Sequence, residues 1–280
     1  MRDISTDEII EAVRKLCIDS NYYLSKDVRD KIEKAQADED SDIAKEILDK
    51  ILENADISKN ENMPMCQDTG MACVFVEIGQ EVHIVNGNIE DAVNEGVRRG
   101  YMEGYLRKSV VKDPIRRINT KDNTPAIIYY DIVPGDKLKV TVAPKGFGSE
   151  NMSQIKMLKP ADGLDGVKKF ILNVAKEAGP NPCPPMVLGV GIGGNFDKAA
   201  YLAKKSLTRP INVRNSDKFY ADLEEELLDE INKLGIGPQG FGGKTTALAV
   251  NIETYPTHIA GLPVAVNISC HVTRHGEVVL

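Results

Sequence analysis

Hydrophobic residues recur at helical spacing in the first fifth of the chain and in short, dense runs after it. Ser5 and Glu8 have the spacing of a capping box, and the apolar positions that follow lie on one helix face: Ile9, Ile10, Val13, Leu16 and Cys17. A second helical pattern covers residues 43–52, and the charged residues 38–40 before it are expected to be a solvated surface. Residues 1–60 are therefore predicted to form a helical segment.

From residue 62 onward, β-favouring runs alternate with helical patterns. Asn88 is the expected N-cap of one helix, and Pro134-Gly135 is an expected turn between two strands. The predicted strands cover residues 71–78, 126–132, 138–143, 186–190, 246–253 and 265–271, and the predicted helices cover 88–106, 164–176, 195–207 and 218–234. The fold class is α+β (mixed α/β), a helical N-terminal region followed by a mixed sheet flanked by helices, with residues 1–280 expected to form a single domain.

Composition and charge narrow the classes of function. The chain has 42% hydrophobic and 28% charged residues and a formal net charge of −7, without a basic stripe, which argues against binding to nucleic acid or anionic membrane. No apolar run approaches the ~18 residues that a membrane span needs, and the first residues make no signal peptide. A cytoplasmic enzyme is therefore expected. Five cysteines, an odd number, favour thiol or metal chemistry over disulfides.

The cysteines divide into two groups. Cys17 and Cys73 lie within apolar patterns and are expected in the core. Cys66, Cys183 and Cys270 lie in loops or at the end of a strand, where side chains from distant segments can converge around a ligand. Their wide spacing excludes a local zinc knuckle and leaves a shared metal site open. Three thiolates on a [4Fe–4S] cluster would leave one iron free as a Lewis acid, which suits hydration and dehydration of hydroxy acids.

Two glycine-rich motifs resemble nucleotide-binding loops. Residues 189–194 match G-x-G-x-x-G, but no acidic residue follows about twenty positions later to hold a ribose. A tight turn is the plainer interpretation. Residues 242–245 resemble the end of a P-loop, but Pro238 stands where its first glycine belongs. A nucleotide-binding enzyme stays an alternative.

Isolated histidines and arginines have two interpretations each. His258 lies in a loop between two predicted strands, and His271 and His275 flank Arg274; surface positions are the simplest interpretation for these histidines. Arg107 follows the helix predicted at 88–106 and is either a surface charge or a partner for a carboxylate.

Several motifs together resemble one enzyme family. They occur in a fixed order: Met65-Cys66-Gln67-Asp68-Thr69-Gly70, Gly146-Phe147-Gly148-Ser149-Glu150-Asn151, Cys183-Pro184-Pro185 followed by a Gly-Gly turn, Phe241-Gly242-Gly243-Lys244, and Ser269-Cys270. From about residue 62 to the end, the chain resembles the iron–sulfur-dependent class I fumarases and tartrate dehydratases. The resemblance implies that Cys66, Cys183 and Cys270 ligate a [4Fe–4S] cluster with one open iron.

The same resemblance assigns roles to further residues. It implies that Gln67 and Asp68 contact the substrate, that Arg107 pairs with a substrate carboxylate, and that the backbone of Gly148 approaches the substrate. His258 matches a histidine facing the active site, so Asp68 and His258 are the candidate catalytic residues. Two positions depart from the family pattern, because Phe147 replaces a glycine and Thr257 stands where arginine is expected.

The resemblance also implies a partner and a reaction. The chain ends ten residues after Cys270 and so resembles a separate α subunit. A β subunit would supply the remaining active-site residues, including the base, in an α₂β₂ assembly. The expected reaction interconverts (S)-malate and fumarate, with L(+)-tartrate dehydration as the alternative, since no residue decides between these dicarboxylic acids. A non-catalytic metal-binding scaffold is the alternative from another class.

Overall fold

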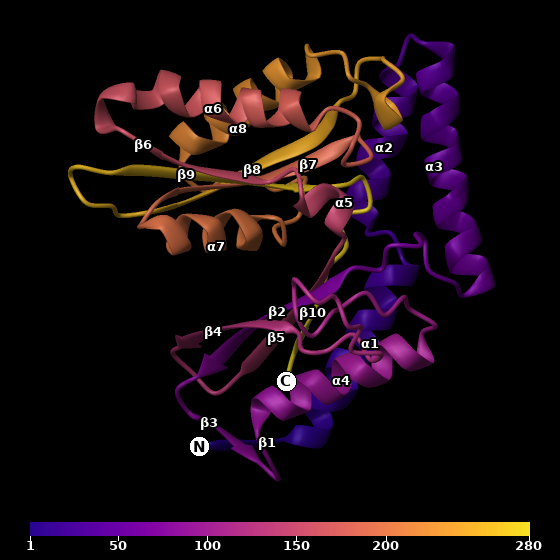
Figure 1. The fold of residues 1–280 in the computed structure, drawn as a ribbon, viewed down its shortest axis with the longest axis vertical. Helices are drawn as coiled ribbons and strands as arrows, with labels where there is room; N and C mark the ends of the chain where they lie inside the picture. Colours follow the sequence, from indigo (N-terminus) through magenta and orange to yellow (C-terminus); the bar gives the residue numbers. More distant parts are fainter. The chain divides into compact units, whose positions relative to one another are not determined.

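The computed structural model describes residues 1–280, and the chain divides into two compact units. Unit 1 comprises Met1–Leu24, Asn54–Phe147 and Arg274–Leu280, and unit 2 comprises Ser25–Glu53 and Gly148–Thr273. Each unit combines a mixed four-stranded sheet with helices, which confirms the predicted fold class (Figure 1). None of the helices is long and apolar enough to cross a membrane.

The sheet of unit 1 has the strand order β10-β5-β2-β4. Its strands are β2 (Met71–Gly79), β4 (Ile127–Val133), β5 (Leu138–Lys145) and β10 (Gly276–Val279). β4 is parallel to β2, and β5 is antiparallel to both β2 and β10. The predicted turn at Pro134-Gly135 therefore joins two strands that lie on opposite sides of β2. A separate parallel pair unites β1 (Arg2–Ser5) with β3 (Val82–Val85).

Two helices supply the rest of the core of unit 1. The predicted capping box of Ser5 and Glu8 starts α1 (Thr6–Tyr22), and the side chain of Asn88 caps α4 (Ile89–Glu103). The two helices pack closely because Gly96 and Gly100 have no side chain; a Cβ on either would lie under 3 Å from α1. Cys17 lies on this contact and is fully buried, as predicted for a core cysteine.

The sheet of unit 2 has the strand order β6-β9-β7-β8, with β7 and β8 parallel and β9 antiparallel to its neighbours. The strands are β6 (Gln154–Leu158), β7 (Met186–Gly193), β8 (Ala247–Tyr255) and β9 (Leu262–Ser269). Helices α6 (Gly163–Ala178) and α8 (Lys218–Asn232) cover one face, and α7 (Phe196–Ser206) covers the other (Figure 1). The remaining helices of the chain are α2 (Lys26–Asp38), α3 (Asp42–Glu61) and the single turn α5 (Phe147–Glu150).

The glycines of the G-x-G-x-x-G motif have a packing role. Gly189 and Gly191 lie inside β7, where a Cβ would approach the carbonyl oxygens of Ala203 and Ala199 on α7 to 2.1 Å. Gly193 and Gly194 follow with φ of +96° and +68° and turn the chain into α7. Gly189 and Gly191 therefore let α7 lie directly on the sheet, and Gly193 and Gly194 make the tight turn of the plainer interpretation.

The charged residues 38–40 are only partly a solvated surface, and here the prediction was wrong for one residue. Glu39 is 3% exposed, and its carboxylate accepts hydrogen bonds from the backbone N–H groups of Asp40 (3.0 Å), Ser41 (3.1 Å) and Lys244 (2.8 Å). A Cβ on Gly243 would lie 2.9 Å from the same carboxylate. The Gly-Gly-Lys part of the 241–244 motif is thus anchored to the α2–α3 junction.

We expect the substitution Glu39→Ala to lower the free energy of unfolding by about 3 kcal/mol, since hydrogen bonds to a charged group contribute about 1.5–3 kcal/mol each and three backbone donors lose this acceptor. Urea unfolding measures this change. The matched control is Asp40→Ala. The Asp40 side chain is 81% exposed in its ion pair with Lys244, so this substitution should change the free energy of unfolding by about 0.5 kcal/mol or less. Equal effects of the two substitutions would contradict the role assigned to Glu39.

Candidate active site

The segment from Cys66 to Gly70 links α3 to β2 in unit 1, as predicted for a loop between a helix and a strand. Two hydrogen bonds of its backbone hold Met65, the residue before the loop. Its N–H donates to Asn21 O at 2.9 Å, and its carbonyl accepts from Asn54 Nδ2 at 2.9 Å. The last residue of the loop must be glycine, because Gly70 has φ +78° and a Cβ there would lie 2.7 Å from the backbone of Lys145. The loop is therefore held in one conformation by its surroundings.

Asp68 is held in this loop by hydrogen bonds of its carboxylate and of its main chain. Its Oδ1 accepts from the N–H of Gly70 at 3.1 Å, and its Oδ2 accepts from the N–H of Phe147 at 2.8 Å. The Asp68 N–H donates to Cys66 Sγ at 3.4 Å. Arg274, only 8% exposed, donates to the Asp68 carbonyl at 2.7 Å. The carboxylate is thus oriented by backbone donors and keeps further acceptor positions for a ligand.

Arg107 is fixed to the same loop through its backbone. The hydroxyl of Thr69, 2% exposed, accepts from Arg107 N–H at 2.8 Å and donates to the Arg107 carbonyl at 3.3 Å. The guanidinium group of Arg107 is exposed and has no ion-pair partner in the structure, and Gln67 is also exposed. The main chain thus brings Gln67, Asp68 and Arg107 into one region of unit 1, with a cation and an amide available to an anion.

Tyr101 of α4 holds this loop through hydrogen bonds to its backbone carbonyls. It is fully buried, burial raises its pKa well above the usual value, and its hydroxyl donates to the carbonyls of Thr69 (2.8 Å) and Gly70 (3.1 Å). Asn123 reinforces the contact by donating to the Gly70 carbonyl at 3.2 Å. The neutral phenol therefore holds the end of the loop at Thr69 and Gly70, and Cys66 lies at the other end of the same loop.

We expect Tyr101→Phe to destabilise the protein by about 1–2 kcal/mol, because two buried carbonyls lose a donor. The Cys66 loop should also open more often, so a thiol reagent should modify Cys66 faster in a Cys183→Ser/Cys270→Ser background. Tyr105→Phe is the matched control, since the Tyr105 side chain is 88% exposed and should affect neither quantity. Unchanged stability and labelling in Tyr101→Phe would show that the phenol does not support the loop.

In unit 2, Cys183 occupies a turn between α6 and β7 in which the predicted absence of regular structure is confirmed. It is exposed, with φ +54°. Its carbonyl lies 3.0 Å from Nδ1 of His271, the residue after Cys270. Gln239 donates through Nε2 and through its backbone N–H to the carbonyl of Pro184, both at 2.8 Å. The turn bearing Cys183 and the segment bearing Cys270 are thus in direct contact.

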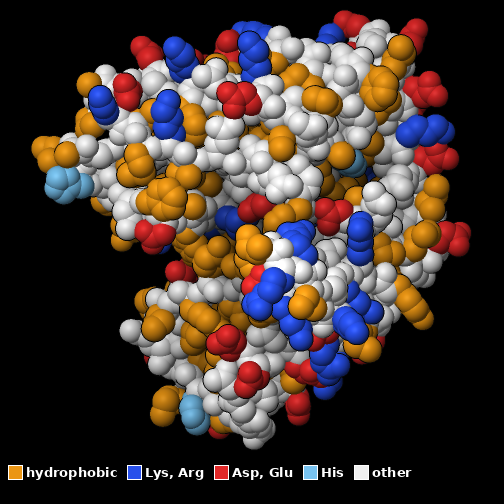
Figure 2. All heavy atoms as spheres, in the orientation of Figure 1, with side chains coloured by type: hydrophobic (Ala, Val, Ile, Leu, Met, Phe, Trp, Pro, Cys, Tyr) orange, Lys and Arg blue, Asp and Glu red, His pale blue; other side chains and the backbone are white.

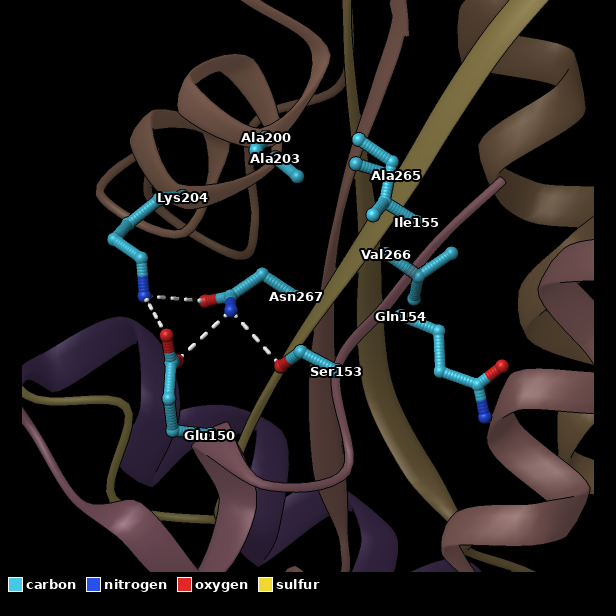
Figure 3. Close-up of a pocket in the computed structure, with 10 residues that line it drawn as sticks. All are labelled: Glu150, Ser153, Gln154, Ile155, Ala200, Ala203, Lys204, Ala265, Val266 and Asn267. Carbon is cyan, nitrogen blue, oxygen red and sulfur yellow. Dashed lines mark hydrogen bonds and ion pairs between the residues drawn. The ribbon is translucent and has the colours of Figure 1, made fainter. Parts of the chain in front are cut away.

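A polar network fixes the strand that leads to Cys270 (Figure 3). Asn267 of β9 donates to Glu150 and to Ser153, both at 2.9 Å, and Lys204 of α7 pairs with Glu150. The network borders a cavity of about 190 Å³. Because its charged groups already pair with each other, we interpret the network as support for the segment that follows Gly148 and for the end of β9, not as a ligand site.

Gly148 and His258 lie in exposed parts of unit 2. A Cβ at Gly148 would have Asn181 O at 3.8 Å as its nearest neighbour, so local packing does not require glycine there. His258 belongs to the loop between β8 and β9, and its Nδ1 accepts from the N–H of Ala260 at 3.2 Å. Thr257, where the family pattern has arginine, donates to the Gly194 carbonyl at 2.8 Å and so attaches this loop to the turn before α7.

None of the five cysteines forms a disulfide, and they separate into buried and accessible ones as the sequence predicted. Cys17 and Cys73 are buried, and burial raises the pKa of the Cys17 thiol to about 12, which disfavours the thiolate. Cys66 and Cys270 are half-buried, and Cys183 is exposed. Cys66 belongs to unit 1 and the other two to unit 2; His, Cys, Asp and Glu side chains form no metal-binding group of three or more. The three accessible thiols fit an iron–sulfur cluster by their donor chemistry.

Sequence reasoning missed the residues that support the loops. His271 was expected at the surface but is half-buried against the Cys183 carbonyl, and Arg274, which was given no role, is buried. Gln239 and Tyr101 gave no signal in the sequence, since their contacts depend on the tertiary fold. One signal was available: Arg274 lies four residues after Cys270, in a segment with little other charge.

Comparison with known proteins gives a consistent result. The family model described as fumarate hydratase (fumerase) matches residues 10–279. A Methanocaldococcus jannaschii protein named "Putative L(+)-tartrate dehydratase subunit alpha" is 44% identical over 275 residues, which cover 96% of this chain and 95% of that protein. The L(+)-tartrate dehydratase subunit alpha of Escherichia coli O157:H7 is 31% identical over 280 residues, covering 99% of this chain and 92% of its own length.

Proposed function

The chain belongs to the fumarate hydratase (fumerase) family, and from this we propose that it is the cluster-carrying α subunit of a hydro-lyase that works with a separate β subunit. The similar proteins from M. jannaschii and E. coli carry "subunit alpha" in their names, which supports a separate partner chain. An α₂β₂ assembly is part of the proposal. Five cysteines without a disulfide fit a reducing compartment, and we propose a cytoplasmic location.

The observation that carries the proposal is the separation of the thiols into two buried and three accessible ones, the latter at the three positions of the family motifs. Cys66, Cys183 and Cys270 would hold a [4Fe–4S] cluster. Bound there with one iron open, the cluster would supply a Lewis acid for breaking or forming a carbon–oxygen bond. The contact of His271 with the Cys183 carbonyl would keep two of the three ligand segments together.

The chain's own residues would bind and orient a dicarboxylate. The exposed guanidinium of Arg107 would pair with one carboxylate, and the amide of Gln67 would donate to it. Asp68, held by two backbone N–H groups, would accept a hydrogen bond from the substrate hydroxyl. Gly148 would let its backbone approach the substrate closely.

His258 would complete the contribution of this subunit as a hydrogen-bond or proton donor. Its Nδ1 accepts from the N–H of Ala260, so a neutral imidazole there carries its proton on Nε2. The base that removes the C3 proton is proposed to come from the β subunit.

Two substrates remain in the proposal. The malate–fumarate pair is the first candidate and follows the description of the family. L(+)-tartrate is the second, and the names of the similar proteins favour it. The substrates differ by one hydroxyl group.

Anaerobic purification with counts of iron and sulfide tests the cofactor, and assays with both substrates in the presence of the β subunit test the reaction. We expect about four irons and four sulfides per chain, broad absorption near ~400 nm, and activity that air abolishes and iron, sulfide and a thiol reductant restore. Zinc without sulfide, or no metal after anaerobic reconstitution, would replace the proposal with a non-catalytic scaffold.

A further inference from the structure

Unit 1 carries a basic segment that the proposed chemistry does not use beyond its first residue. Residues 107–121, between α4 and β4, form a hairpin that we name the basic hairpin. It contains six cations and one carboxylate, Asp113, in a chain whose formal net charge is −7, so the expectation that the chain has no basic stripe was wrong for this segment. The cations are Arg107, Lys108, Lys112, Arg116, Arg117 and Lys121. Figure 2 shows Lys and Arg side chains gathered with hydrophobic ones on this part of the chain.

Most of these cations have no partner. Arg116 pairs with Asp113 at 2.9 Å, which lowers the pKa of that carboxyl, and the other five make no ion pair in the structure. Elsewhere in unit 1 the pattern is different; Arg14, for example, contacts both Glu11 and Glu103. Unpaired like charges repel each other, so this arrangement is stabilised when an anionic surface approaches.

Large apolar side chains accompany the cations. Ile115 at the tip of the hairpin is 86% exposed and Ile118 is 60% exposed, while Tyr105 just before the hairpin is 88% exposed. These apolar side chains would not contribute to binding a small anion. Exposed apolar and aromatic side chains interspersed with arginine are the composition of a protein–protein interface.

The hairpin is also preorganised. The N–H of Lys112 donates to Ile118 O at 2.7 Å, and the N–H of Thr120 donates to Val110 O at 2.9 Å. Asn123 Oδ1 accepts from the N–H groups of Ser109 (2.7 Å) and Val110 (3.2 Å) at its base. A surface fixed in this way loses little conformational entropy when a partner binds.

We propose that the basic hairpin is the docking surface for the β subunit, which would present carboxylates to its cations and apolar recesses to Ile115 and Ile118. This inference rests on the proposed function, because it takes its partner from there. The hairpin begins at Arg107, which Thr69 fixes to the loop of Cys66 and Asp68. A subunit bound to the hairpin would therefore bring its groups beside the part of the site that unit 1 supplies.

The test measures the affinity of the α chain for the β subunit by titration calorimetry, using Ile115→Asp and Lys112→Glu. Both side chains are exposed, so the variants should fold like the wild type. We expect each to weaken binding at least about 30-fold, the effect of losing an interface hot spot. Ile132→Asp on β4 is the matched control, since Ile132 is 76% exposed in the same unit and outside the hairpin; its affinity should stay within about threefold of the wild type.

Wild-type affinity in both hairpin variants would overturn the docking role. A second outcome would also overturn it: both variants bind the β subunit like the wild type but have a lower kcat/KM, and high salt removes the difference in kcat/KM from the wild type. That result would show that the hairpin attracts the anionic substrate instead. A wild-type chain that forms no complex with the β subunit would reject the proposed partnership itself. Complex formation by the wild type thus separates failure of the proposed function from failure of the docking surface.

Discussion

Serine in place of Cys183 is expected to leave the protein with little bound iron and sulfide and to lower hydro-lyase activity of the complex at least about 100-fold, the upper end of the cost of losing an outer-shell partner. A hydroxyl is a poor substitute for a thiolate toward iron. The Cys183 side chain is exposed, and its backbone already has φ +54°, so serine should not disturb the turn. Iron and sulfide analysis, the absorption near ~400 nm and the activity with added β subunit measure the three effects.

Cys73→Ala is the matched control for Cys183→Ser. Cys73 lies inside β2 at 2% exposure, so its loss should lower stability by about 1 kcal/mol and leave the iron and sulfide content unchanged. Equal cluster content in wild type and Cys183→Ser would remove Cys183 from the ligand set. A colourless Cys73→Ala protein that is fully folded would show that the separation into core and ligand cysteines is wrong.

The sequence predicted the elements whose pattern is local. Helices with a strong cap, such as those starting at Ser5 and Asn88, and long β-favouring runs such as β2 were found within a few residues. It missed α2 and the short strands β1, β3, β6 and β10, which are too short or too polar to show a period. Strand order was also hidden, because β4 and β5 are neighbours in sequence while β2 lies between them.

For the candidate site, the sequence supplied the residues with exposed chemical groups, and their roles stay predictions. The motifs that contain Arg107, Asp68 and the three accessible cysteines can be recognised from the amino-acid sequence alone. The supporting residues could not be found that way, because the contacts of Tyr101 with Thr69 and of Gln239 with Pro184 join segments 32 and 55 positions apart. Buried carboxylates are the clearest case, since a glutamate in a charged run is usually solvated and only the fold shows otherwise.

Glu224 is such a buried carboxylate, and its replacement by alanine is expected to give the largest loss of stability among the charged residues of unit 2. It lies on α8 with 0% of its side chain exposed. Its oxygens accept from Arg209, from the N–H of Ile252 at 2.8 Å and from the N–H of Asn215 at 3.0 Å. Removing the carboxylate leaves a guanidinium group and two backbone donors poorly compensated, which costs about 3–5 kcal/mol.

Thermal unfolding of Glu224→Ala should therefore show a midpoint about 10 °C lower, since 1 kcal/mol corresponds to roughly 2–4 °C in a protein of this size. Arg209 keeps Glu253 at 2.9 Å, which limits the loss for its guanidinium but does not help the two backbone donors. The neighbouring Glu225 is the matched control: its side chain is 67% exposed, its contact with Arg214 is 3.6 Å long, and Glu225→Ala should change stability by about 0.5 kcal/mol or less. If both variants unfold at the same midpoint, Glu224 does not join α8 to β8 through these hydrogen bonds, and hydrophobic packing alone holds that helix on the sheet.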